Sequence, residues 1–224
     1  MTAEAAFWND LAERYARQPL ANPAAFERKI EITRSRMKPT DVVLDIGCGT
    51  GTLALRLASG AATIHGLDIS SEMIRIARGK AETEGAANVS FHVGSLDSFE
   101  LFEPASLDGV CAYSLLHLVE ELPAALGRIY RLLRPGGFFI SSTVCLSESW
   151  LPYRPILEVM RWLGKAPRVR TLRKRELEDE LRHAGFDGLE QPDVGAQSSI
   201  AFIVAVKPRT PSSSSDHSGS RPVF

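Results

Sequence analysis

The sequence predicts an α/β fold with a doubly wound sheet of seven strands, mostly parallel, that ends in an antiparallel hairpin. Three observations support this prediction. A short apolar run leads into a turn of alternating glycines, after which a helical pattern opens, as expected for a buried parallel strand. Apolar runs and helical patterns then alternate, which favours helices on both faces of a parallel sheet. The last two apolar runs, 186–192 and 199–207, have no helix between them, so they must pair antiparallel.

Residues 1–40 precede this alternation and are expected to form a helical cap. Apolar residues recur at helical spacing over 3–37, and the pattern is broken between Pro19 and Pro23. The main domain is then expected to cover 41–207. Its first five strands are predicted at 41–46, 62–68, 88–93, 107–112 and 137–143, and its helices at 51–59, 70–84, 121–133 and 173–184.

Two other segments stand out by composition. The stretch 147–171 is rich in Trp, Leu, Pro and Tyr, which predicts a helical insertion before the last helix. This insertion either forms a lid over a hydrophobic substrate or completes the core. The end of the chain, 208–224, is rich in Ser, Pro and Gly and is expected to be disordered.

Bulk composition narrows the functional classes. Hydrophobic residues make up 44% of the chain, enough for a full core, and the net charge of −1 gives no overall attraction to nucleic acid or membrane. The three cysteines lie in or beside apolar runs and lack zinc-site spacing, so we expect reduced thiols and no metal site. The start of the chain lacks a signal-peptide pattern, and no apolar run reaches the ~20 residues of a membrane span. A cytoplasmic protein is expected.

The glycine turn and the acids near it indicate which cofactor binds. A dinucleotide fingerprint that begins at Gly47 and Gly49 needs its third glycine at position 52, which is Thr52. Asp45, inside the turn, would repel a pyrophosphate but suits a cationic amine. Asp68 follows the turn at the spacing of about 20 residues that ribose recognition requires. A ribose, an amine and no pyrophosphate describe S-adenosyl-L-methionine better than NAD.

Several motifs together resemble the class I S-adenosylmethionine-dependent methyltransferases. V-L-D-I-G-C-G-T-G at 43–51 and G-L-D-I-S at 66–70 are similar to the family's cofactor motifs, and 106–117 and 132–140 are similar to its fourth-strand and fifth-strand motifs. The likeness covers 41–207 and implies a Rossmann-like sheet. The helical N-terminus and the 147–171 insertion resemble the small-molecule branch, which includes the quinone-biosynthesis methyltransferases.

The resemblance also implies roles for individual residues. Many relatives have Asp where Ser95 stands, so that contact departs from the family pattern. Alternatives from the residues themselves stay open: Asp68 or Ser70 can cap the next helix, Met73 can be a core residue, and Tyr15 can dock the N-terminal helix. The implied cofactor contacts are Tyr15, Asp45 at the amine, Gly47, Gly49 and Gly51 under the methionine, Asp68 at the ribose, Ile69 and Met73 beside the adenine, Ser95 and Leu96 at its edge, and the backbone near Ser114.

His117 follows the fourth predicted strand, at the rim where a substrate approaches the methyl group. A histidine there can take a proton from the acceptor, because its ordinary pKa is near neutrality. It can equally hydrogen-bond backbone at a strand–helix turn. We therefore treat His117 as the candidate catalytic residue alongside that structural alternative.

The resemblance implies a methyltransferase acting on a small apolar or aromatic molecule by in-line displacement. The alternative is an RNA methyltransferase that uses 165–175, a run rich in Lys and Arg with no acid, which can also be a solvated turn. We find no pattern of an RNA-binding module in the sequence. A non-enzymatic cofactor sensor and an NAD dehydrogenase are the remaining hypotheses, and Thr52 disfavours the second.

Overall fold

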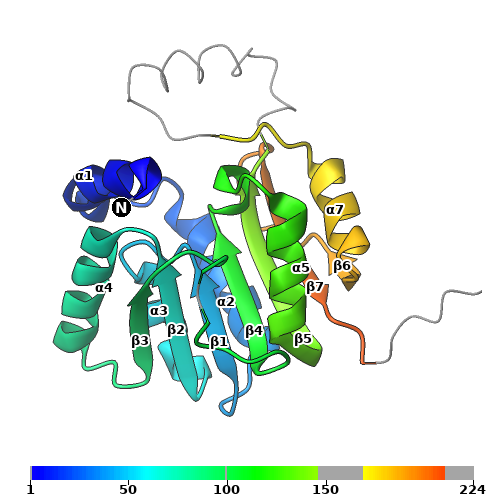
Figure 1. Cartoon of the computed structure of the whole chain (residues 1–224), viewed down its shortest axis with the longest axis horizontal. Helices are drawn as coiled ribbons and strands as arrows, with labels where there is room; N and C mark the ends of the chain where they lie inside the picture. Colours follow the sequence, from blue (N-terminus) through cyan, green and yellow to red (C-terminus); the bar gives the residue numbers. More distant parts are fainter. Residues whose placement is uncertain (1, 99, 146–168, 210–224) are drawn as a thin grey trace, which may run out of the picture.

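The computed structural model describes residues 2–98, 100–145 and 169–209, which contain one seven-stranded sheet of order β3-β2-β1-β4-β5-β7-β6 (Figure 1). Its four pairings among β1 to β5 are parallel, and β7 pairs antiparallel with both β5 and β6. The predicted fold class and the terminal hairpin are therefore confirmed. The strands are β1 Val42–Ile46, β2 Thr63–Asp68, β3 Val89–Val93, β4 Leu107–Tyr113, β5 Leu133–Val144, β6 Asp187–Glu190 and β7 Ile200–Val206.

Helices cover both faces of this sheet, as a doubly wound fold requires. One buried apolar cluster joins the sheet to α2, α3 and α4, and a second joins its other face to α5 and α7. None of the helices in the described residues is long and apolar enough to span a bilayer. The helices are α1 Ala3–Arg17, α2 Pro23–Arg36, α3 Thr52–Leu57, α4 Ser71–Glu84, α5 Leu122–Leu132 and α7 Lys174–His183, with short 3₁₀ helices η1 Ala58–Gly60 and η2 Leu116–Leu118.

The strand order places a crevice between β1 and β4. The chain runs from β1 outward through β2 to β3, and then returns to β4 on the other side of β1. In open α/β sheets, ligands bind outside the carboxyl ends of the strands at such a reversal of order. The glycine turn follows β1, and η2 follows β4, so both predicted site segments lie at this edge.

The predicted strand boundaries differ most at β5, which begins at Leu133 rather than at 137. Its pairing with β4 is irregular: Leu107 pairs with Leu133, but Gly109 pairs with Phe138. Gly136, at φ +84°, takes up the extra residues in a left-handed conformation. The sequence Arg-Pro-Gly-Gly at 134–137 is typical of a turn. In the structure these residues instead form a bulge within β5.

The N-terminal helix α1 is docked onto the start of α4 by side chains. Asn9 Oδ1 accepts a hydrogen bond from Ser70 Oγ at 2.7 Å and from the Glu72 N–H at 3.2 Å. Glu13 and Arg75 add an exposed ion pair between the same two helices. These contacts place α1 beside α4 (Figure 1). Most of the predicted lid, 147–171, and nearly all of the predicted tail, 208–224, lie outside the described residues.

Candidate functional site

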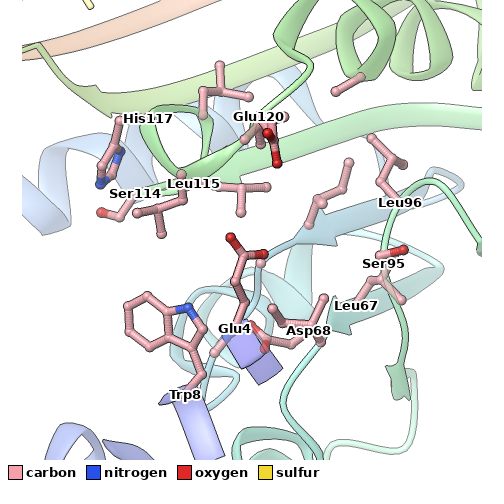
Figure 2. Close-up of a pocket in the computed structure, with 18 of the residues that line it drawn as sticks. Glu4, Trp8, Leu67, Asp68, Ser95, Leu96, Ser114, Leu115, His117 and Glu120 are labelled. Carbon is pink, nitrogen blue, oxygen red and sulfur yellow. Dashed lines mark hydrogen bonds between the residues drawn. The ribbon is translucent and has the colours of Figure 1, made fainter. Parts of the chain in front are cut away.

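A pocket of about 670 Å³ lies at the carboxyl ends of β1, β2 and β4 (Figure 2). Its inner wall is formed by the turns that follow these strands. Its outer wall is formed by α1 and by η2 with the residues after it. Of the residues predicted for the site, the structure brings together in its lining Tyr15, Gly47, Gly49, Asp68, Ile69, Met73, Ser95, Leu96, Ser114 and His117.

The glycine turn is fixed to the neighbouring strand by backbone hydrogen bonds. The N–H groups of Gly47 and Cys48 both donate to the carbonyl oxygen of Leu67, at 2.7 and 3.1 Å. Gly47 has φ +67°, and a Cβ there would lie 2.7 Å from Leu115 Cδ1. Glycine is therefore required here both by the left-handed backbone and by the close approach of the β4 turn.

Asp68 joins the glycine turn to the start of α4. Its Oδ2 accepts from the Gly49 N–H and its Oδ1 from the Ser70 N–H, each at 2.9 Å. A carboxylate has about four acceptor positions, so both oxygens can accept one further hydrogen bond. Burial raises the pKa of Asp68, and these N–H donors oppose that shift. Ser70 is the residue that caps α4, because its Oγ accepts from the Met73 N–H.

Two predicted residues lie behind the pocket wall rather than in it. Asp45 is fully buried, and its Oδ2 has no hydrogen-bond partner among the described residues. The pKa of Asp45 is raised to about 8, mainly by burial and to a smaller extent by the negative charge of Asp68. Gly51 faces the core, because a Cβ there would lie 2.6 Å from Phe91 Cζ and 2.9 Å from Ala77 Cβ. The glycine at 51 thus allows α3 and α4 to pack closely against the sheet. The spacing of the glycines in the sequence could not distinguish this packing role from contact with a ligand.

The turn after β4 carries Ser114 in a left-handed conformation. Its φ is +55°, which is uncommon for a residue with a side chain and clusters at functional sites. Its N–H donates to the Ser142 carbonyl oxygen at 2.6 Å, so the strained residue is anchored to β5. The chain then leaves the sheet and forms η2, which brings His117 to the pocket.

His117 lies at the outer rim of the pocket, where Figure 2 shows it beside Ser114. Burial lowers the pKa of His117 to about 4, so the ring is neutral at pH 7. Its Nδ1 has no hydrogen-bond partner among the described residues. Its backbone carbonyl oxygen accepts from the Arg170 N–H at 2.7 Å, which fixes the turn.

The outer wall contains residues that the sequence did not assign to the site. Glu4 and Trp8 line the pocket together with Tyr15. At 100° per residue these three positions fall within about 40° on one helical face, a signal the sequence carried. Figure 2 shows the Glu4 carboxylate and the Trp8 indole directed into the pocket.

Other unassigned lining residues come from the segment after β3, from η2 and the residues that follow it, from α5 and from the segment before α7. Glu121 was interpreted only as a helix start, and it is the N-cap residue of α5. The apolar part of the lining includes Leu115, Leu118, Val119, Ile129 and Val169, and its further carboxylates are Asp97, Glu120 and Glu121.

The basic run 165–175 lies only partly within the described residues. Arg170 donates from Nη1 to the Glu120 carbonyl oxygen at 3.2 Å, and the Arg173 N–H donates to Glu176 at the start of α7. None of the described residues form a group of three or more His, Cys, Asp or Glu that could hold a metal. The three cysteines are free and buried.

Comparison with known proteins identifies related chains. A family model described as a methyltransferase domain matches residues 37–184. The chain is 31% identical over 148 residues to a ubiquinone biosynthesis O-methyltransferase of Xylella fastidiosa, a match that covers 64% of this chain and 60% of the relative. It is 31% identical over 136 residues to a demethylmenaquinone methyltransferase of Leptospira interrogans, covering 55% of each. The chain thus spans three-fifths or less of these curated relatives.

Solved structures show the same fold at lower identity. A phosphoethanolamine N-methyltransferase 2 of Haemonchus contortus, in complex with S-adenosyl-L-methionine, superposes with a TM-score of 0.69 at 21% identity, covering 90% of this chain and 60% of that one. The [4+2]-cyclase SpnF superposes with a TM-score of 0.66 at 24% identity, covering 81% of each chain. These likenesses concern the arrangement of the sheet and its helices.

Proposed function

The chain belongs to the methyltransferase-domain family, and from this premise we propose that it transfers the methyl group of S-adenosyl-L-methionine to a small-molecule acceptor. The observation that carries the proposal is Asp68. It lies at the end of β2 in the pocket and is hydrogen-bonded to the glycine turn after β1. One carboxylate therefore couples the two segments that the resemblance assigns to the two ends of this cofactor.

The pocket residues fit that cofactor in several respects. Asp68 retains acceptor positions for two ribose hydroxyls. Gly47 and Gly49 leave the turn without side chains where the methionine part would pass. Ile69, Met73 and Leu96 offer apolar contact to an adenine, and Ser95 offers a polar edge. The carboxyl of Asp45 has an unpartnered oxygen behind the turn, and a nearby cationic amine would favour its charged form.

The cofactor supplies an electrophilic methyl group, so the chain's own contribution is chiefly positioning. Holding two reactants in line can lower a barrier by about 7–11 kcal/mol. The backbone-anchored turns after β1 and β4 fix one side of the pocket, and α1 closes the other. Walls that exclude water when both ligands are bound would also protect the reactive methyl group from hydrolysis.

We propose His117 as the group that accepts a hydrogen bond from the acceptor. Its neutral ring is suited to that role at pH 7. If His117 acts in this way, His117→Gln will lower turnover at least tenfold while leaving binding of S-adenosylhomocysteine unchanged. Unchanged turnover in this variant would assign the residue to the structure of the turn.

The acceptor is proposed to have an apolar or aromatic part. The pocket beside His117 offers Leu115, Leu118 and Val119 as its contacts.

We also propose that residues 1–40 form a helical cap on the methyltransferase domain at 41–207, and that the protein is cytoplasmic. Three buried free thiols support a reducing compartment.

Calorimetry with S-adenosylhomocysteine and with NAD tests the proposed function directly. We expect S-adenosylhomocysteine to bind with a dissociation constant in the micromolar range, and NAD to show no saturable heat. Binding of NAD in place of S-adenosylhomocysteine would overturn the proposal. A parallel titration with a short RNA at two salt concentrations tests the alternative acceptor, since phosphate contacts make RNA binding salt-dependent.

A further inference from the structure

The charge of the pocket exceeds what the cofactor requires. The described residues that line it include no Lys or Arg. S-adenosyl-L-methionine brings an amine and a sulfonium, partly balanced by its own carboxylate, and Asp68 is assigned to its ribose. On α1, the Glu4 carboxylate therefore remains for another positive group. The carboxylates of the lining are Glu4, Asp68, Asp97, Glu120 and Glu121.

Glu4 and Trp8 form the part of the outer wall best suited to a cation. They lie at i and i+4 on α1, so their side chains are neighbours on the helix surface. In Figure 2 both side chains point into the pocket from α1, across from Leu115 and His117. A carboxylate next to an indole attracts an ammonium by charge and, over the face of the ring, by cation–π interaction.

The side of the pocket opposite α1 is also compatible with a bound ammonium group. Glu120 is also directed toward the pocket in Figure 2. Arg170, which donates to the Glu120 carbonyl oxygen, is not a lining residue. His117, on the same side, is neutral at pH 7, so it does not repel a cation. An ammonium at Glu4 would thus face no cationic side chain among the described residues that line the pocket.

We propose that the methyl acceptor is a small organic amine whose ammonium group binds between the Glu4 carboxylate and the Trp8 indole, opposite His117, with its apolar part against Leu115, Leu118 and Val119. This inference rests on the proposed function. In the reaction the ammonium first loses a proton to water at the pocket mouth. The nitrogen lone pair then forms the bond to the methyl carbon, while the carbon–sulfur bond breaks and its electron pair goes to sulfur.

Matched amines and alcohols test this inference on the full chain. The probes are benzylamine, 2-phenylethylamine and tryptamine, each paired with benzyl alcohol, 2-phenylethanol or tryptophol, titrated by calorimetry at pH 7 with saturating S-adenosylhomocysteine. We expect at least one amine to bind about tenfold or more tightly than its alcohol, because an ion pair and a cation–π contact together are worth about 1.4 kcal/mol.

Charge-neutral variants locate the effect. Glu4→Gln should abolish the preference for the amine without changing the affinity for S-adenosylhomocysteine by more than about twofold. Asp10→Asn removes the same charge from an exposed position of α1 that does not line the pocket, and should leave the preference intact. Trp8→Leu should reduce it partially, by about threefold.

The outcomes separate this inference from the proposed function. If S-adenosylhomocysteine binds but no amine is preferred over its alcohol, or if Glu4→Gln keeps the preference, the amine inference is wrong and the proposed function stands. If S-adenosylhomocysteine does not bind, both fail. Transfer of a labelled methyl group to the preferred amine, lost in Glu4→Gln and kept in Asp10→Asn, would support both.

Discussion

The inner wall of the pocket is held by backbone hydrogen bonds, whereas α1, one part of its outer wall, is held by side chains. At the inner wall, Leu67 accepts from two N–H groups of the glycine turn, and Asp68 accepts from two further N–H groups. At the outer wall, α1 is attached to α4 through Asn9 and an exposed ion pair. Exposed ion pairs contribute at most about 1 kcal/mol. We infer that the inner wall is the fixed part of the site and that α1 can move relative to it.

The largest effect is expected from Asp68→Ala, because it removes the carboxylate that joins the two segments of the inner wall. Hydrogen bonds to a charged group are each worth about 1.5–3 kcal/mol, so losing those to a ribose should weaken S-adenosylhomocysteine binding by about 100-fold or more. Calorimetry measures the change, with Asp10→Asn as the control for charge. An affinity within fivefold of the unchanged protein would remove Asp68 from the binding site.

A second effect on the inner wall concerns Asp45 and pH. Its pKa is raised to about 8 from the ordinary value of 3.8, mainly by burial. Between about pH 4 and 8 the folded protein holds a proton that the unfolded chain has released. The free energy of unfolding must therefore fall as the pH rises through this window, by at most about 1.4 kcal/mol per pH unit.

Asp45→Asn isolates that contribution, since the amide does not titrate. Urea unfolding of both proteins without ligand, at pH 5.5 and 7.5, gives the difference in stability at each pH. We expect this difference to shift in favour of the variant by about 2 kcal/mol at the higher pH. A difference that is the same at both pH values would mean that Asp45 is ionised in the folded protein throughout.

The smallest effect is expected from Asn9→Ala, which loosens the outer wall. Loss of two hydrogen bonds to the start of α4 should cost about 1 kcal/mol and weaken S-adenosylhomocysteine binding by about fivefold. Gln18→Ala, at the exposed end of α1, serves as the matched control. A loss as large as that of Asp68→Ala would contradict the distinction between a fixed and a movable wall.

The same two regions differ in how far the sequence revealed them. The inner wall follows from local patterns: the apolar run before Gly47, and Asp68 at the end of the next strand, are adjacent because parallel strands end at one edge. The outer wall depends on how α1 docks, which local patterns do not specify. Glu4 was therefore missed, although it shares a helical face with Tyr15 and Trp8.

Burial was the other feature that the sequence could not supply. The family resemblance implied that Asp45 and Gly51 contact the cofactor, but neither residue lines the pocket. Whether a turn residue faces the ligand or the core depends on side chains distant in sequence, such as Phe91 against Gly51. The bulge that starts β5 at Leu133 has the same origin, because pairing with β4 extends a segment whose local sequence reads as a turn.

Ser70 performs two tasks with different parts of one hydroxyl group. Its oxygen accepts from the Met73 N–H and so caps α4, while its hydrogen is donated to Asn9 on α1. Detachment of α1 would break only the second bond, and α4 would keep its capped first turn. A swing of the N-terminal helix would therefore leave the first turn of α4 ordered.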